Sequence, residues 1–160
     1  GDIFDFNDNS YLETIYPFEG YLGQKVDDVN NTSVVNKYCY LEICFLLTGD
    51  ATKEVEEELL NEGHDLSSNI LKVGHHGSHY SSTDEFLEAI HSSTAVIQVG
   101  VDNSFNHPHL RTIKKLDRAG INILRTDQIG KIMISTDGYS YWQNDNLSDN
   151  FLSAIMNERI

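Results

Sequence analysis

The sequence predicts an α/β fold with its chemistry gathered at one edge of a sheet. Short apolar runs alternate with amphipathic stretches along the chain, which is the pattern of strands alternating with helices. Three of the apolar runs lead into an Asp or a His, at Asp50, His75 and His107. In open α/β sheets, ligands bind outside the carboxyl ends of the strands, so we expect these three residues to share one site.

Length and charge narrow the classes of function. The chain has 160 residues, which is one domain's worth, and a formal net charge of −14. This charge disfavours a DNA-binding groove lined by Lys and Arg, although a bound divalent cation would reverse the sign locally and admit a phosphate substrate. No apolar run approaches the roughly 18 residues that span a bilayer. The chain begins at Gly1 rather than Met, and we expect it to be a piece of a longer protein.

The two cysteines are predicted to be buried thiols. Cys39 and Cys44 stand in apolar surroundings and lack the spacing of a metal site. We therefore do not expect a disulfide between them.

The first half of the chain predicts three strands and a helix. Alternating residues 11–16 indicate a strand, and residues 33–47 are long enough for two antiparallel strands with a tip at Leu41-Glu42. Residues 53–61 form an amphipathic helix with acidic first turns, and Gly63 is placed to end it.

The second half repeats the strand–helix alternation. Residues 82–85 read Ser-Thr-Asp-Glu, a capping box, and Pro108 suits the first turn of a helix that Gly120 closes. The predicted elements are strands at 70–73, 95–101 and 121–124, helices opening at 82–85 and at 108, a hairpin of 131–135 with 139–142, and a final helix at 149–158.

Asp50 follows Thr48 and Gly49 at the end of an apolar run. It could cap the helix that follows, because Asp is a preferred capping residue. The recurrence of histidines at the next two strand ends favours a metal ligand, since carboxylate and imidazole together suit zinc, manganese or iron.

His75 and His76 are adjacent and lie between two glycines, a pattern without a packing rationale. In an extended segment neighbouring side chains face opposite ways, so we expect one of the two to point inward. We favour His75 as a metal ligand and His76 as a residue that supports the site or contacts substrate.

His107 and His109 flank Pro108. Either imidazole could act as a general acid, a phosphate donor or a metal ligand, and the alternative is that the segment only starts a helix. Ser78 lacks the nucleophile-elbow pattern, so a serine hydrolase is not favoured.

Four blocks of the sequence resemble the metallo-β-lactamase fold, and most closely the hydrolase domain of ComEC-type competence proteins of bacteria, which import DNA. The blocks are residues 31–35 (NTSVV), 45–50 (FLLTGD), 71–78 (LKVGHHGS) and 106–109 (NHPH). Their order and spacing match, and the resemblance runs from about Asn30 to Gly138.

The resemblance implies an αββα sandwich that holds one or two divalent metals, zinc or manganese, and hydrolyses a phosphodiester or related ester. In the resemblance, Asp50 matches a carboxylate that can bridge two metals, His75 matches a histidine ligand, and His107 matches a histidine before proline. Taking the resemblance together with the residue pattern, we predict catalytic roles for Asp50, His75 and His107, and metal binding by Asp50, His75, His76 and His109. It also implies a soluble domain of a bacterial membrane protein, with DNA or a phosphoester as substrate of the parent protein.

The family's His-x-His-x-Asp-His motif is absent from this sequence. Residues 1–160 therefore resemble a single, partial domain, mainly the second half of the sandwich, with a mixed sheet and flanking helices. We expect this chain alone to bind metal weakly and to turn over poorly, and we expect self-association to cover the exposed sheet. Two alternatives stay open, namely a free-standing hydrolase of small esters or phosphoesters and a non-catalytic interaction domain that keeps the fold.

Overall fold

The computed structural model describes residues 1–144 of the chain. Its strands are β1 (Ile3–Asp5), β2 (Ser10–Tyr16), β3 (Val35–Tyr40), β4 (Ile43–Leu47), β5 (Ile70–Lys72), β6 (Thr94–Ile97), β7 (Asn122–Arg125), β8 (Ile134–Thr136) and β9 (Tyr141–Gln143). Its helices are α1 (Lys53–Glu62), α2 (Asp84–Ile90), α3 (Leu110–Arg118) and α4 (Thr126–Ile129), with 3₁₀ turns η1 (Val29–Thr32) and η2 (Gly74–Gly77).

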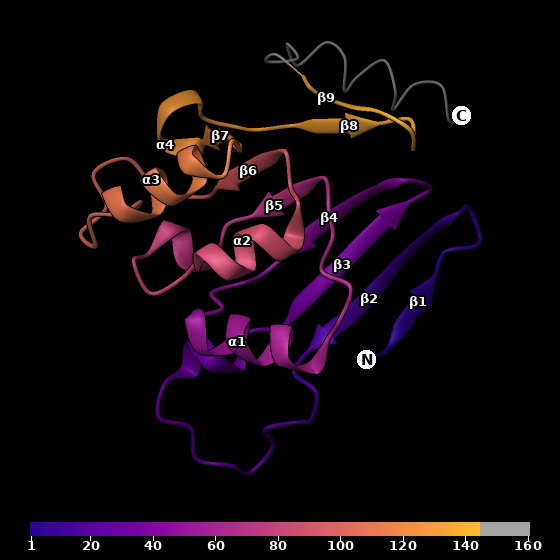
Figure 1. Ribbon diagram of the computed structural model, residues 1–160, viewed down its shortest axis with the longest axis horizontal. Helices are drawn as coiled ribbons and strands as arrows, with labels where there is room; N and C mark the ends of the chain where they lie inside the picture. Colours follow the sequence, from indigo (N-terminus) through magenta and orange to yellow (C-terminus); the bar gives the residue numbers. More distant parts are fainter. Residues whose placement is uncertain (145–160) are drawn as a thin grey trace, which may run out of the picture.

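The first seven strands form one mixed sheet in sequence order (Figure 1). Strands β1 to β4 are paired antiparallel, and β4 to β7 are paired parallel. Parallel neighbours need a crossover connection, which α1, α2 and α3 supply here. The predicted α/β class and mixed sheet are therefore confirmed.

One face of the sheet packs against the three crossover helices. The buried row of the sheet passes through Val35, Leu46 and Leu71 and meets Leu59 of α1 and Phe86 of α2 in a single core cluster. Alternate residues of each strand point to this face, as the period of two requires. Helices α1, α2 and α3 therefore all lie on this face of the sheet.

The opposite face is covered only in part by the β8–β9 hairpin. Tyr141 of β9 reaches Thr94 of β6 with its hydroxyl at 2.9 Å. Beyond the hairpin, apolar side chains are exposed, among them Phe4 and Phe6 near the β1 edge. Within residues 1–144, this hairpin is what lies on the second face, so the complete αββα sandwich and the self-association stay predictions.

Most element boundaries follow the sequence signals. Gly63 ends α1 in the left-handed conformation, and the turn between β3 and β4 lies at Leu41-Glu42 as predicted. The cap of α2 is Thr83, whose hydroxyl accepts from Phe86 N, one residue later than the capping box predicted. The strand predicted at 95–101 is shorter in the structure. The helix predicted at 149–158 lies outside the described residues.

Helix α3 begins later than predicted. Pro108 lies before the helix, and His109 is its cap, because His109 Nδ1 accepts the N–H of Arg111 at 3.2 Å. The prediction that Pro108 occupies the first turn was wrong, because His109 takes the cap position and the helix begins at Leu110.

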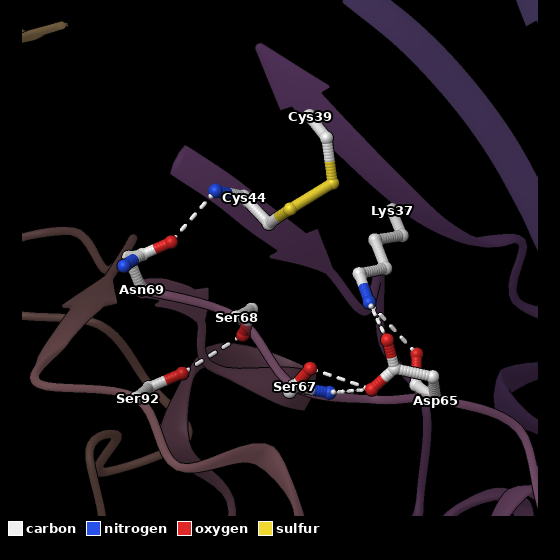
Figure 2. The surroundings of a disulfide bond; sticks show 8 residues. All are labelled: Lys37, Cys39, Cys44, Asp65, Ser67, Ser68, Asn69 and Ser92. Carbon is white, nitrogen blue, oxygen red and sulfur yellow. Dashed lines mark hydrogen bonds and ion pairs between the residues drawn. A yellow bond between two sulfur atoms is a disulfide. The ribbon is translucent and has the colours of Figure 1, made fainter. Parts of the chain in front are cut away.

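The prediction that the cysteines are free thiols was also wrong. Cys39 of β3 and Cys44 of β4 are directly opposite in the register, with their Cα atoms 4.1 Å apart, and they form a disulfide (Figure 2). A two-residue turn at Leu41-Glu42 places Tyr40 opposite Ile43 and Cys39 opposite Cys44, and this register is the signal that the sequence analysis missed. Beside it, Lys37 Nζ lies 2.9 Å from Asp65 Oδ2, which fixes the loop after α1 to β3.

None of the helices in the described part of the chain has the length and apolar character needed to cross a bilayer.

Candidate functional site

The predicted site residues lie at the edge of the sheet where the parallel strands end. The loops that follow β4, β5 and β6 carry Asp50, His75 with His76, and His107 respectively. Because these strands are parallel neighbours, their carboxyl ends lie side by side and bring the three loops together.

Asp50 does not cap the helix that follows it. The cap position of α1 is Thr52, two residues further on. The backbone N–H of Asp50 donates to Ser33 Oγ at 3.0 Å, which anchors the loop. Its carboxylate Oδ1 lies 3.5 Å from His76 Nε2 and 3.8 Å from Lys72 Nζ. The capping alternative is therefore excluded.

His75 and His76 form a tight left-handed turn instead of an extended segment. Their φ angles are 47° and 54°, a conformation that side-chain-bearing residues adopt rarely and that clusters at functional sites. The reasoning from an extended backbone, that only one of the two can point inward, was therefore wrong. Both imidazoles face the site edge, each toward a different partner.

His76 is held in one tautomer. Its Nδ1 lies 2.6 Å from the carbonyl oxygen of Gln98, and a carbonyl only accepts, so Nδ1 carries the proton. In the neutral ring, Nε2 then presents a lone pair to the carboxylate of Asp50. Because both side chains are partly exposed, the 3.5 Å between these two acceptors leaves them able to share a proton or a cation. A histidine bonded through its other nitrogen to a backbone carbonyl is the usual arrangement of a metal ligand.

His75 and His107 form a second pair. Their ring centroids lie 5.7 Å apart with the planes at 75°. The Nδ1 atoms of both are buried and have no hydrogen-bond partner within residues 1–144. Buried polar atoms are normally satisfied, so these two are the unexplained groups of the site.

The pKa of His107 is lowered from its ordinary value of 6.5. Burial is the main cause, and the neighbouring imidazoles of His75, His76, His79 and His109 act in the same direction. His107 therefore stays neutral near pH 7, with a lone pair available for a proton or a cation.

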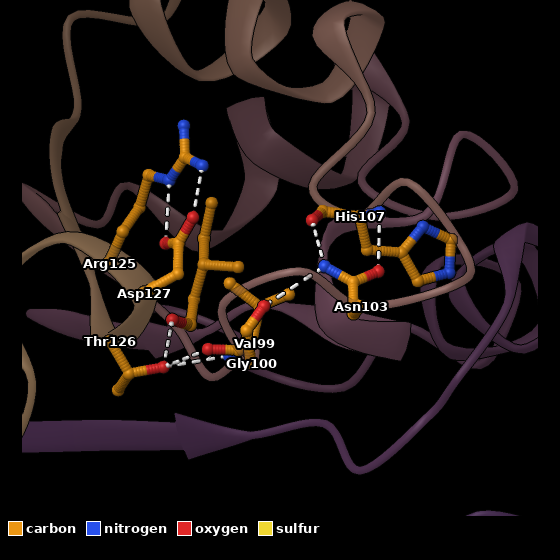
Figure 3. A network of polar contacts seen from close by, with 8 residues as sticks. Val99, Gly100, Asn103, His107, Arg125, Thr126 and Asp127 are labelled. Atoms are coloured by element: carbon orange, nitrogen blue, oxygen red, sulfur yellow. Dashed lines mark hydrogen bonds and ion pairs between the residues drawn. The ribbon is translucent and has the colours of Figure 1, made fainter.

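The loop that carries His107 is braced by one side chain that the sequence analysis missed (Figure 3). Asn103 Nδ2 donates to the carbonyls of Gly100 and His107 at 3.1 and 2.7 Å, and its Oδ1 accepts from His107 N at 2.9 Å. The only sequence signal was an Asn four residues before the histidine, too weak to notice without the loop's path.

Thr126 anchors the same loop at its start (Figure 3). Its hydroxyl accepts from Val99 N and donates to the Val99 carbonyl, both at 2.8 Å. Next to it, Arg125 and Asp127 form an ion pair at 2.5 Å. The beginning of α4 thus fixes the end of β6.

Lys72 is a further residue missed from the sequence. Its Nζ donates to the carbonyl of Gly49 and lies near Asp50, and burial lowers its pKa while Asp50 opposes the shift. Its ammonium group thus places a positive charge beside the loop between β4 and α1.

His109 is set apart from these pairs. Its Nδ1 caps α3, and its ring lies 4.9 Å from that of His79, so Nε2 is the atom it can offer to a ligand. Ser78 Oγ accepts from Tyr80 N at 3.3 Å, which is a local turn contact.

The donors fit a divalent cation in kind but fall short in number. In the described part of the chain, no three or more His, Cys, Asp or Glu side chains converge closely enough to hold a metal ion. The structure offers two pairs, Asp50 with His76 and His75 with His107, where a closed zinc site takes four ligands. The metal roles of these residues and of His109 stay predictions.

Comparison with known proteins finds competence proteins among the relatives of this chain. It is 41% identical over 103 residues to ComE operon protein 3 of Bacillus subtilis and 36% identical over 110 residues to competence protein ComA of Neisseria gonorrhoeae. It is also 29% identical over 90 residues to recombination protein 2 of Haemophilus influenzae. No protein-family model matches the chain.

These alignments cover much of this chain but little of the relatives. They include 64% and 68% of the present sequence and span 13% and 16% of the B. subtilis and N. gonorrhoeae proteins. The chain is thus homologous, over about two thirds of its length, to a small part of proteins named for competence.

Proposed function

We propose that this chain is a portion of a metal-dependent, nuclease-like hydrolase domain of a competence DNA-uptake protein. The observation that carries the proposal is the geometry of the site edge. There Asp50 faces His76 at 3.5 Å, and the Nδ1 atoms of His75 and His107, which have no partner among residues 1–144, lie on neighbouring loops. The similarity to competence proteins supplies the biological setting.

Asp50, His75 and His76 are the residues that would hold the cation, with His107 or His109 as a further donor. A bound divalent ion lowers the pKa of a water toward neutrality and polarises the scissile ester. We propose that the partial αββα sandwich receives its remaining ligands from another part of the parent protein. The relatives are several times longer than this chain, so they have room for such a part.

The chain's own residues prepare the site for this chemistry. Gln98 fixes the tautomer of His76, and Asn103 fixes the position of His107. Because His107 is neutral near pH 7, it can take a proton from a nucleophile or, once protonated, give one to a leaving group. Lys72 compensates the charge of Asp50 and keeps the strand end in place.

The direct test is metal content by elemental analysis. We expect the parent protein to hold zinc or manganese and to lose it in an Asp50→Ala, His75→Ala double variant. An Asp27→Ala, His64→Ala double variant removes the same residue types outside the site and should retain the metal. Absence of metal from both this chain and the parent protein would refute the proposal, and would favour a non-catalytic interaction domain.

A second function on the same site is hydrolysis of a small ester or phosphoester by a free-standing enzyme. The net charge of −14 favours it, because it repels a polyanion. Faster metal-dependent turnover of bis(p-nitrophenyl) phosphate than of any polynucleotide would identify this alternative.

A further inference from the structure

The site edge carries an exposed aromatic side chain that the proposed hydrolysis does not use. Phe105 is 76% exposed, on the loop between β6 and α3. Its ring stacks on the imidazole of His107 with centroids 5.9 Å apart and planes 20° apart. Single exposed apolar residues are common on protein surfaces, so what distinguishes Phe105 is its contact with a candidate catalytic imidazole, which places the ring where a bound substrate would reach it.

The loop holds this ring in a defined place. Asn103 ties Gly100 and His107 together across the loop, and Thr126 ties its start to α4 (Figure 3). Phe105 lies inside the segment that Asn103 closes, directly before Asn106, whose φ is 56°. The outer face of the ring is thus presented to solvent from a braced turn.

A second aromatic side chain extends the pattern along the same edge. Tyr80 is 55% exposed and packs on His79, with ring centroids 3.8 Å apart. His79 in turn lies 4.9 Å from His109. Exposed rings therefore follow both the β5 and the β6 loops.

The charge of the chain limits how it can bind a nucleic acid. With a net charge of −14, it cannot rely on release of counterions by Lys and Arg. Stacking of bases on aromatic rings needs no net charge and tolerates any sequence. It does need an unpaired base, because the faces of bases inside a duplex are covered by their neighbours.

We propose that Phe105 is a stacking platform for an unpaired nucleobase, and that the site takes a single-stranded polynucleotide. This inference rests on the proposed function for the identity of the reacting group, a phosphodiester next to the stacked base. Phe105 positions the strand over His107 and takes no part in bond breaking.

The test is binding of fluorescein-labelled oligothymidylate to this chain, measured by anisotropy in EDTA so that nothing is cleaved. Moderate salt is used, because it screens the repulsion between the acidic chain and the phosphates. We expect Phe105→Ala to weaken binding about 5- to 100-fold, which is the range that stacking aromatics give. Phe105→Trp should restore it. Tyr139→Ala is the matched control, because Tyr139 is also well exposed (67%) but lies in the β8–β9 turn. This variant should bind oligothymidylate as the native chain does.

An abasic oligonucleotide of the same length separates stacking from phosphate contacts. The native chain should bind this abasic strand as weakly as Phe105→Ala binds oligothymidylate. The affinity of Phe105→Ala should be the same for the abasic strand and for oligothymidylate. Equal affinity of the native chain for abasic and base-carrying strands, a preference for duplex, or no measurable binding of oligothymidylate would overturn the inference.

The two proposals fail separately. Binding in EDTA does not depend on metal, so the Asp50→Ala, His75→Ala variant should keep its preference for single strands. If the chain binds single strands through Phe105 but neither it nor the parent protein holds metal, the domain binds nucleic acid and does not hydrolyse it. Metal-dependent hydrolysis of small phosphodiesters without stacking would refute the role of Phe105 and leave the proposed chemistry intact.

Discussion

Glu56 joins two of the site loops and makes the stability of the chain depend on pH. It lies in the first turn of α1, is 2% exposed, and accepts from the backbone N–H groups of Ser82 and Thr83 at 2.5 and 2.8 Å. Lys115 also reaches this turn, donating to the Ser82 carbonyl at 2.9 Å. The carboxylate of Glu56 thus links α1, which begins just after Asp50, to the turn that precedes α2.

Burial raises the pKa of Glu56 from 4.5 to about 7, against the opposing effect of the two N–H groups and Lys115. Between these two values the folded chain holds a proton that the unfolded chain has released. Stability therefore falls as pH rises through this window, by about 1.4 kcal/mol per pH unit. The total is about 3 kcal/mol.

The assay is urea unfolding followed by circular dichroism at pH 5 and pH 8. The side chain of Glu56→Gln is neutral at both pH values. The free energy of unfolding of this variant should therefore rise by about 3 kcal/mol relative to that of the native chain on going from pH 5 to pH 8. The other titrating groups are the same in both proteins, so their effects cancel in this comparison. Glu56→Ala leaves both buried N–H groups unpaired and should be less stable by about 2–4 kcal/mol in total. A difference between the native chain and Glu56→Gln that does not change with pH would refute the reasoning, because it would mean that the N–H groups keep Glu56 ionised throughout.

Two further changes test the packing of the site and the hairpin. Gly77→Ala would place a Cβ 2.7 Å from Pro108 Cβ at a φ of +79°, so it should lower stability in thermal melts by more than the roughly 1–2 kcal/mol of a left-handed residue alone. Gly63→Ala, with a φ of +72° and nothing within 4 Å, is the control, and equal losses in both would contradict the clash. Reduction of the Cys39–Cys44 disulfide opens a short loop and should cost about 2 kcal/mol, seen as a lower Tm with reductant. The Cys39→Ala, Cys44→Ala variant should not respond to reductant, and an unchanged Tm of the native chain would show that the link does not constrain the unfolded state.

Local signals in the sequence were sufficient for much of the fold. Gly63 lies just after a run of helix-forming residues and ends α1 in a left-handed conformation, as a glycine at that place commonly does. The turn at Leu41-Glu42 follows from the length of the apolar segment around it. The alternation of strands and helices required crossover connections, hence parallel strands with aligned carboxyl ends. That rule alone brought Asp50, His75 and His107 to one edge.

Sequence alone determined which residues meet at the edge, and only the tertiary structure decided how they meet. The left-handed turn of His75 and His76 depends on loops packed around it, and the tautomer of His76 depends on the carbonyl of Gln98, which lies 22 residues away in the chain. The role of Asn103 depends on the path of the loop between β6 and α3. The types of these residues do not reveal that they are in contact, because hydrogen bonding and burial act through space rather than along the chain.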